Sequence, residues 1–98
     1  MNTVSRSELA TYLDNLFQIH EVSEDPSNNG LQVEGTDQIQ KAVFGVDACG
    51  SLLDKAAEIS ADFVFVHHGV SWGPGLKHLT GITASRLRTL FQNNISLY

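Results

Sequence analysis

The chain has 98 residues, a formal net charge of −5, and one cysteine in a composition that is 42% apolar. This size and composition indicate one small globular domain over residues 1–98. They exclude a multidomain chain, a disulfide-stapled scaffold and a disordered tail. The acidic balance argues against nucleic-acid binding, since only three scattered bases (Lys77, Arg86 and Arg88) follow Asp62.

The first predicted element is a helix from Ser5 to Gln18. Ser5 and Glu8 have the spacing of a capping box, in which the two side chains accept hydrogen bonds from free backbone N–H groups. Apolar side chains then recur at helical spacing, which predicts that one face of the helix is apolar. These are Leu9, Tyr12, Leu13, Leu16 and Phe17. Residues 20–38 lose all periodicity, which predicts a long loop of the kind that often carries function.

Two strands separated by a helix are predicted next. Residues 41–46 have a strand pattern, and Ser51 is expected to cap a helix that runs to Ile59. Phe63–Val66 is apolar on both faces, as is typical of a central parallel strand covered by helices. This four-residue run is the longest apolar stretch, far short of the roughly 20 residues of a membrane span. The N-terminal residues lack a signal-peptide core, so we expect a cytoplasmic protein with a reduced Cys49.

A glycine-rich loop, a helix over residues 83–93 and a strand over residues 95–98 complete the chain. This order of elements predicts an α/β fold with a layered, largely parallel sheet and helices on both faces. The chain stops inside an apolar strand pattern, without a cap, turn or polar tail. We therefore expect further residues after Tyr98.

The strongest candidates for chemistry are His67 and His68, which directly follow the apolar strand. Ligands of open α/β sheets bind beyond the carboxyl ends of the strands, so the position suits a site. Neighbouring residues of an extended chain point to opposite sides. We therefore expect each imidazole to bind a different metal ion, with the two ions about 3.5–4 Å apart. The alternative is that one histidine belongs to the core and the other to a loop.

A two-metal site also needs carboxylates, and no acidic residue follows Asp62. Asp47 ends the first predicted strand and should lie at the same sheet edge as the histidines. We expect it to orient an imidazole or contact substrate, with direct metal ligation and a plain turn as the alternatives. Glu34 lies in the long loop, where we expect it to be solvated.

Asn29 and Gln32 belong to a stretch with two adjacent asparagines and a glycine, residues 28–32. Such a stretch forms a turn, and a turn is one complete explanation for it. The functional alternative is that the amides reach the site and hydrogen-bond a substrate or a metal-bound water.

Other reactive or aromatic side chains fit a site less well. Cys49 would need a histidine partner to act as a nucleophile, and a free cysteine is more often a small buried apolar residue. His20 and His78 have no partner at ligand spacing. Trp72 lies in the glycine-rich loop, where it would serve as a lid, as a stacking residue or as a subunit contact.

Several motifs in this order resemble those of a known family. They are residues 29–35 (NGLQVEG), 45–48 (GVDA), 61–69 (ADFVFVHHG), 86–90 (RLRTL) and 94–98 (NISLY). Together they resemble the N-terminal part of the dinuclear-metal GTP cyclohydrolase 1 type 2 proteins, the Nif-three-like family. The resemblance covers essentially the whole chain but well under half of a typical family member.

The resemblance implies one half of a two-lobed α/β fold, with two metals at the base of a cleft between the lobes. His67 and His68 match the two N-terminal metal-ligand histidines of the family. The remaining family ligands, an aspartate shortly after the last strand and a distant histidine and glutamate, are absent from this chain. The sequence is therefore expected to be an N-terminal portion, with weak metal affinity on its own.

The resemblance also implies a function and an assembly. Mixed nitrogen and oxygen ligands suit Zn, Fe, Mn or Ni, and such ions could support hydrolytic opening of the GTP imidazole ring. Family members form toroidal homohexamers built from dimers. The alternative function is a metal-binding scaffold or interaction protein without turnover. Nothing in the sequence itself selects guanine, since no phosphate-binding P-loop is present.

Overall fold

The structure is a computed structural model and describes residues 2–98. Its elements are β1 (Val4–Ser5), α1 (Arg6–Phe17), the 3-10 helix η1 (Ile19–Glu21), β2 (Gln38–Ile39), β3 (Ala42–Asp47), α2 (Gly50–Glu58), β4 (Phe63–His68), α3 (Gly81–Gln92) and β5 (Ser96–Leu97). The strands β3, β4 and β5 form a parallel sheet in that order, and β1 pairs with β2 as a separate antiparallel ribbon.

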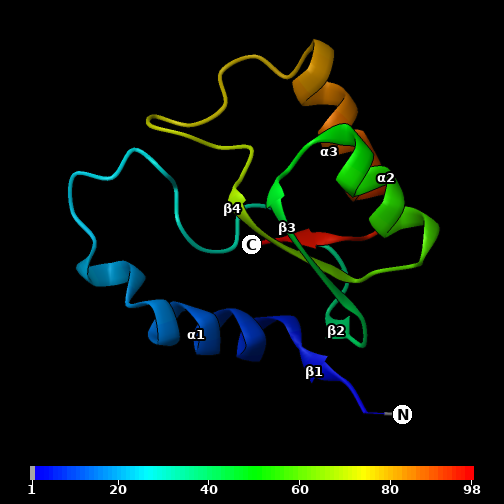
Figure 1. Cartoon of the computed structure of the whole chain (residues 1–98), viewed down its shortest axis with the longest axis horizontal. Coiled ribbons are helices and arrows are strands. Elements are labelled where there is room, and N and C mark those ends of the chain that lie inside the picture. The colour runs from blue at the N-terminus through cyan, green and yellow to red at the C-terminus, as the bar shows by residue number, and fades with distance from the viewer. Residues whose placement is uncertain (1) are drawn as a thin grey trace.

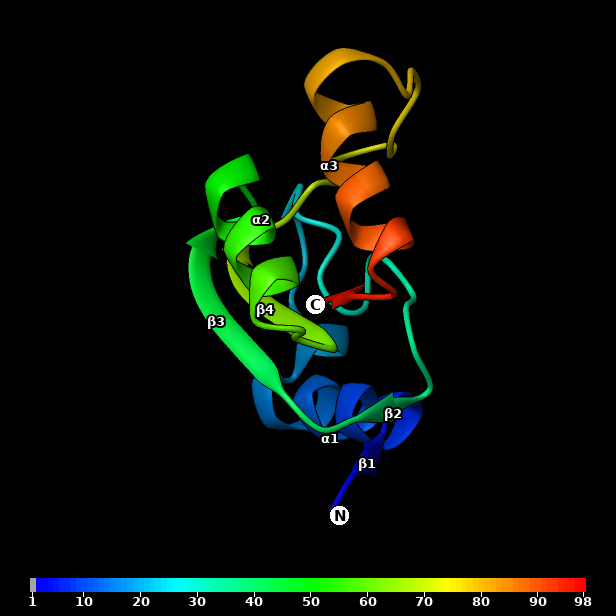
Figure 2. The same cartoon turned by 90° about the vertical axis from the view of Figure 1, so that its right-hand side faces the viewer.

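Helices cover both faces of the parallel sheet (Figures 1 and 2). The helices α2 and α3 pack together over one face, and α1 lies across the other. The strand β4 is central and is hydrogen-bonded on both sides. The predicted layered α/β fold with a parallel sheet is therefore confirmed.

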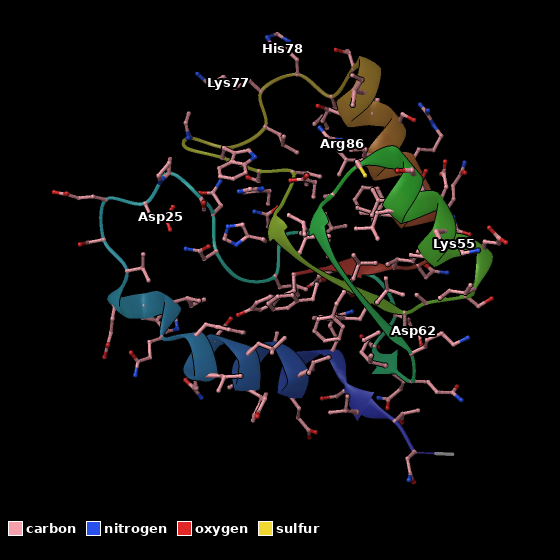
Figure 3. The ribbon with its side chains drawn as sticks, viewed as in Figure 1. Asp25, Lys55, Asp62, Lys77, His78 and Arg86 are labelled. Carbon is pink, nitrogen blue, oxygen red and sulfur yellow. The ribbon has the colours of Figure 1, made fainter. Side chains whose placement is uncertain are left out.

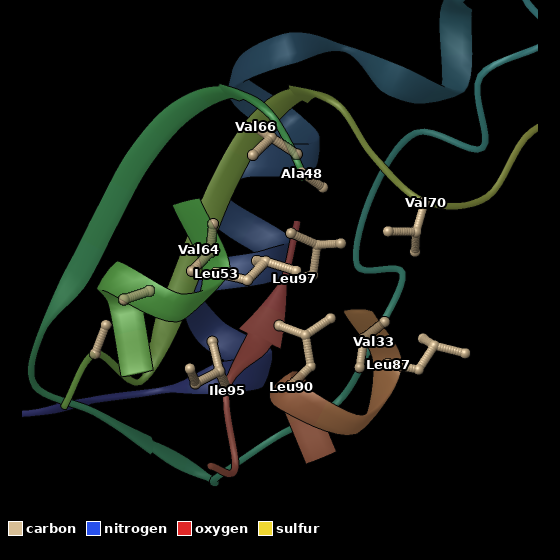
Figure 4. Close-up of a cluster of buried hydrophobic side chains, with 12 residues drawn as sticks. Val33, Ala48, Leu53, Val64, Val66, Val70, Leu87, Leu90, Ile95 and Leu97 are labelled. Carbon is tan, nitrogen blue, oxygen red and sulfur yellow. The ribbon is translucent and has the colours of Figure 1, made fainter. Parts of the chain in front are cut away.

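Alternate side chains of β4 enter two separate apolar clusters. Val64 and Val66 belong to the larger cluster, which also contains residues of α2 and α3 (Figure 4). Phe63 belongs to the smaller cluster beneath α1. Because side chains alternate along a strand, this pattern also decides which face each residue at the end of β4 takes.

The helix α1 begins where the sequence predicts. The hydroxyl of Ser5 accepts a hydrogen bond from the Glu8 backbone N–H at 3.1 Å, which confirms the N-cap. The helix ends at Phe17, because Gln18 takes a left-handed conformation with a φ of 52°. This is one residue before the predicted end.

The predicted apolar face of α1 is only partly buried. Leu13 is buried, whereas Tyr12, Leu16 and Phe17 are 62%, 56% and 50% exposed. The helix crosses a sheet of only three strands, so part of its apolar surface extends beyond the sheet. The edge strand β3 is left open on the same side, and its Phe44 is 71% exposed.

The two later helices begin earlier than predicted. Cys49, and not Ser51, occupies the N-cap position of α2. Ser51 lies in the first turn, and its hydroxyl is 3.3 Å from the Cys49 thiol, so the predicted cap is wrong. The helix α3 begins at Gly81, two residues before Thr83.

The predicted loop over residues 20–38 is ordered by β5. Val33 forms an antiparallel bridge with Leu97, and the Leu97 N–H donates to the Val33 carbonyl at 2.9 Å. The Gly35 N–H donates to the Ser96 hydroxyl at 2.8 Å. A Cβ at Gly35 would collide with the backbone carbonyl of Asn94, so this close approach requires glycine. These contacts carry the loop past the end of β5 toward the end of β4.

Tyr98 joins the end of β5 to α1. Its hydroxyl donates a hydrogen bond to Asp14 Oδ1 at 2.7 Å. Burial, together with the neighbouring carboxylate, raises the pKa of the Tyr98 hydroxyl well above its usual range. The protonated phenol is therefore the form that the fold stabilises.

Within residues 2–98, no helix has both the length and the apolar character needed to cross a lipid bilayer.

Candidate functional site

The site is built at the carboxyl ends of β3 and β4. Both strands run beyond their predicted ends, so that His67 and His68 are the last residues of β4 and Asp47 is the last residue of β3. The parallel register sets Asp47 opposite His68. Strand pairing therefore brings the predicted histidine pair and the predicted carboxylate to one sheet edge.

Asp47 forms a hydrogen bond with one of the two imidazoles. The His68 Nδ1 lies 2.8 Å from Asp47 Oδ1. A carboxylate only accepts hydrogen bonds, so this geometry assigns the proton to Nδ1 and leaves the Nε2 lone pair free. A carboxylate behind a histidine orients the ring and raises its basicity in metal sites. Asp47 therefore has the geometry of the predicted orienting residue.

His67 takes the other face of the sheet. It continues the side of β4 that carries Phe65, toward α1, whereas His68 continues the side of Val64 and Val66. The two rings still approach at the strand end, with centroids 4.4 Å apart and planes at 53°. Both side chains are exposed. The pair can therefore be reached from solvent.

Gln32 braces the loop that follows β4. Its Oε1 accepts from the backbone N–H groups of Val70 and Ser71 at 2.8 and 3.1 Å. Its Nε2 donates to the backbone carbonyls of Asn28 and Ser71 at 2.9 and 3.1 Å. These four bonds use every donor and acceptor site of the amide. The geometry thus favours a positioning role for Gln32 over a contact with substrate.

Asn28 also joins the two loops, whereas Asn29 braces its own loop. The Asn28 Nδ2 donates to Ser71 Oγ at 2.6 Å, and the Asn29 Nδ2 donates to Asp25 Oδ2 at 3.2 Å. The backbone N–H of Ser27, and then the Asn29 amide, hold the pKa of the Asp25 carboxyl below its usual range. The loop of residues 25–32 is therefore a folded wall beside the histidines, as well as a turn.

Trp72 lies beside the histidine pair, whereas Cys49 contacts Ser51 instead. The Trp72 ring lies 5.8 Å from the His68 ring, which agrees with a role beside the site. The Cys49 thiol is exposed and faces Ser51, and a hydrogen bond from that hydroxyl lowers the pKa of the thiol. In the described part of the chain, no hydrogen bond joins Cys49 to either imidazole of the pair, so a cysteine–histidine nucleophile is not assembled.

The remaining candidates lie outside the site. Glu34 is exposed and is 3.8 Å from Arg6 across an ion pair, as expected for a solvated residue. His78 lies on the outer loop before α3 (Figure 3). His20 is exposed in η1. Over residues 2–98, no group of three or more histidine, cysteine, aspartate or glutamate side chains comes together to hold a metal.

A pocket of about 380 Å³ opens beside His67. Its lining includes aromatic side chains from three parts of the chain, namely Phe17, Phe65 and Trp72, and the amides of the loop over residues 25–32. Sequence reasoning missed Phe17 and Ser71 as members of the site. Phe17 was assigned to the apolar face of the first helix, and no motif singles out Ser71 in the glycine-rich loop.

Comparison with known proteins identifies relatives along the whole chain. Residues 4–98 match the family Duf34/NIF3 (NGG1p interacting factor 3). A GTP cyclohydrolase 1 type 2 homolog of Pyrococcus abyssi is 39% identical over 97% of this chain and 37% of its own length. The protein of the same name from Escherichia coli K12 is 47% identical over 76% of this chain and 30% of its own. A crystal structure from Thermus thermophilus superposes with a TM-score of 0.91 at 44% identity, over 97% of this chain and 39% of that one.

The chain thus belongs to the Duf34/NIF3 family and spans about two fifths or less of the length of these relatives.

Proposed function

We propose, from this family membership, that the complete protein is a metal-dependent hydrolase of the GTP cyclohydrolase type. In this proposal His67 and His68 are nitrogen ligands to two divalent transition-metal ions, of the Zn, Fe, Mn or Ni class. The observation that carries it is the 2.8 Å contact between Asp47 and His68 Nδ1, which frees Nε2 at the carboxyl end of a parallel strand.

The residues present fit part of such a site. Two exposed imidazoles meet at the edge of the sheet, and one is already oriented by a carboxylate. Bound ions of this class act as Lewis acids and activate water for hydrolysis. The described residues bring together no third free ligand, so the other ligands are expected from elsewhere in the complete protein.

In this proposal four residues of the site have defined tasks. His67 and His68 hold the ions, and Asp47 keeps the His68 tautomer that presents Nε2. Gln32 fixes the loops around the histidines and limits their movement. Substrate would approach the histidines from the pocket that His67 lines.

Metal analysis of the complete protein tests this proposal. We expect about two transition-metal ions per subunit, and loss of GTP turnover in His67→Ala and His68→Ala. His78→Ala is the matched control, because this histidine lies on the outer loop, and it should keep full metal content and turnover. A well-folded protein with neither metal nor turnover would contradict the proposal. Retained metal without turnover on any nucleotide would favour the scaffold alternative.

We also propose that the protein assembles with copies of itself, as a toroidal homohexamer. Support comes from an exposed apolar row on the α1 side of the sheet. Phe44 is 71% exposed and Val46 is 64% exposed. The Phe44 ring lies 5.3 Å from Phe65, which lies 5.5 Å from the ring of Phe17. Exposed apolar patches of this kind mark association surfaces.

Sedimentation velocity tests the assembly. Phe44→Ser is expected to shift the complete protein toward smaller species, because it removes a central ring of the exposed row. Ile82→Ser is the matched control, since Ile82 is 75% exposed on α3, outside this row. Equal sedimentation of wild type and Phe44→Ser would exclude this row from the interface.

A further inference from the structure

The turn that follows β3 is held by contacts inside the described chain. The Ala48 N–H donates to the His68 carbonyl at 3.0 Å, which adds one bond to the ladder beyond its last residue pair, Asp47 and His68. The Ala48 carbonyl accepts from Nη1 of Arg86 at 3.2 Å. Ala48 itself is 2% exposed and belongs to the larger apolar cluster. This one residue therefore joins the end of β4, the core and a side chain of α3.

Arg86 reaches the turn from a helix that the core holds in place. Its neighbour Leu87 and, about one turn further on, Leu90 are buried in the same cluster as Ala48. The Arg86 side chain lies beside the start of α2 (Figure 3). Because these leucines seat α3 on the sheet, the guanidinium gives the turn after β3 a fixed point outside its own strand.

The Arg86 guanidinium is not arranged for stability alone. Its Nε is buried and has no hydrogen-bond partner among residues 2–98. The described chain already encloses this atom, so other residues could not pair with it without a rearrangement. A buried donor without a partner costs free energy, and such a group in a folded protein calls for an explanation. The contact with the Ala48 carbonyl supplies one, because the side chain that reaches this oxygen encloses its own Nε.

The histidine site beside this turn depends on close positioning. Asp47 Oδ1 and His68 Nδ1 are 2.8 Å apart, and a relative shift of about 0.8 Å would carry them beyond hydrogen-bonding distance. Both residues end their strands, and the ends of elements open more easily than their middles. Functional side chains need supports that hold them to within about 0.5 Å. The contact between Ala48 and Arg86 is such a support.

We propose that Arg86 is a positioning residue for the Asp47–His68 pair, acting through the Ala48 carbonyl and the end of the ladder between β3 and β4. The inference deepens the proposed function and rests on it for the role of His68 as a metal ligand. The effect of Arg86 on the His68 ring does not require a metal, so it can be measured separately from metal binding and turnover.

Arg86→Met separates positioning from packing. The methionine keeps much of the apolar stem and removes every N–H of the guanidinium. Loss of the bond to the buried Ala48 carbonyl lowers stability, whereas loss of the unpaired Nε raises it. The urea midpoint of the complete protein should therefore change little. Arg88→Met is the matched control, because Arg88 is exposed two residues further along the same helix.

Two readouts report on the histidine site itself. The first is ¹⁵N NMR of histidine-labelled, metal-free complete protein, at a pH where the imidazoles are neutral. Arg86→Met should shift His68 from the Nδ1–H toward the Nε2–H tautomer, and Arg88→Met should not. The second is Zn²⁺ titration against a competing chelator. In Arg86→Met one of the two binding steps should weaken about tenfold, and the other should stay within about twofold, because the support acts on the His68 side.

A double variant tests whether Arg86 acts through the pair. Asp47→Ala removes the carboxylate that selects the His68 tautomer. In that background Arg86→Met should cause no further change of the tautomer, because the contact that it positions is already absent. An additive change would overturn the inference.

Other results would also overturn it. One is an unchanged His68 tautomer in Arg86→Met, which an arginine that only ties α3 to the sheet would give together with a lower urea midpoint. Another is an equal change in Arg88→Met. If Arg86→Met fails to fold, amide exchange of the wild type decides: the Ala48 N–H should exchange as slowly as the middle of β4, and exchange at the rate of a frayed end would refute the support. A complete protein that binds no metal but shows the tautomer change would refute the proposed function and leave the positioning role standing.

Discussion

The Gln32 amide should contribute more to stability than its position in a loop suggests. Gln32→Ala removes four hydrogen bonds at once, to two backbone N–H groups and two backbone carbonyls. These bonds join the loop of residues 25–32 to the loop after β4. Their loss leaves four main-chain groups without partners in a part-buried region, where only some of them gain water instead.

The magnitude follows from the number of bonds. A hydrogen bond contributes about 0.5–1.5 kcal/mol net, so four would contribute about 2–6 kcal/mol. Partial access of water should reduce the loss, and we expect Gln32→Ala to lower the free energy of unfolding by about 2–4 kcal/mol. A domain of this length has about 5–15 kcal/mol in total, so the change would remove a large share.

Urea unfolding, followed by Trp72 fluorescence and by circular dichroism, measures this change. The urea concentration at the midpoint of unfolding should fall, while the slope of the free energy of unfolding against urea concentration should change little. Gln92→Ala is the matched control: it truncates a glutamine at the exposed end of α3 and should change stability by less than about 0.5 kcal/mol. If Gln32→Ala lowers the free energy of unfolding by no more than the control Gln92→Ala does, the reasoning is refuted. Backbone contacts alone would then hold the two loops.

Three further predictions concern neighbouring contacts. Gly69→Ala should destabilise the protein, because the added Cβ would collide with Gln32 Oε1. The same substitution should destabilise a Gln32→Ala variant much less, and a double-mutant cycle from urea unfolding should give a coupling energy of about 1 kcal/mol or more. Asp47→Ala should lower the metal affinity of the complete protein about 10- to 100-fold in calorimetric titration and shift His68 toward the Nε2–H tautomer in ¹⁵N NMR, and an unchanged tautomer would exclude the orienting role. Because the folded-state pKa of the Tyr98 hydroxyl is raised, its stabilisation should be complete below about pH 10 and be lost as the pH rises further. Urea unfolding between about pH 8 and pH 11 should show this loss of stability, and the loss should be smaller in Tyr98→Phe. If the free energy of unfolding falls equally steeply with pH in wild type and Tyr98→Phe, the hydroxyl is not the group responsible.

The sequence predicted the sheet and the placement of the histidines because both follow from short-range rules. An apolar run on both faces of Phe63–Val66 requires helices on both sides of a strand. The next two residues then have to lie at the carboxyl edge of the sheet. Asp47 follows in the same way, because parallel strands end at a common edge. These inferences need only the pattern of each strand and the order of the elements.

Features that depend on tertiary contacts were harder to predict from the sequence. The spacing of Tyr12, Leu16 and Phe17 predicts an apolar face, but burial depends on how many strands lie beneath the helix, and α1 crosses only three. The serine at position 51 is a good cap residue by type, yet the chain turns into α2 earlier than such a cap would require. The role of Gln32 depends on a loop almost forty residues away in sequence, and no local pattern encodes that contact.

The alternation of β4 also explains why the site remains open within the described residues. His67 faces the side of α1, and His68 faces the side of α2 and α3, so no single neighbouring element can supply ligands to both. Asp47 lies near both histidines, but its hydrogen bond to His68 Nδ1 already commits its carboxylate to the His68 side of the sheet. Two neutral imidazoles carry no charge to offset a divalent ion, and acids from both sides would be needed to hold two. Metal affinity should therefore be a property of the complete protein, with the 98-residue chain binding Zn²⁺ or Mn²⁺ much more weakly in calorimetric titration. Equal affinity of the two forms would mean that the histidine edge alone is sufficient.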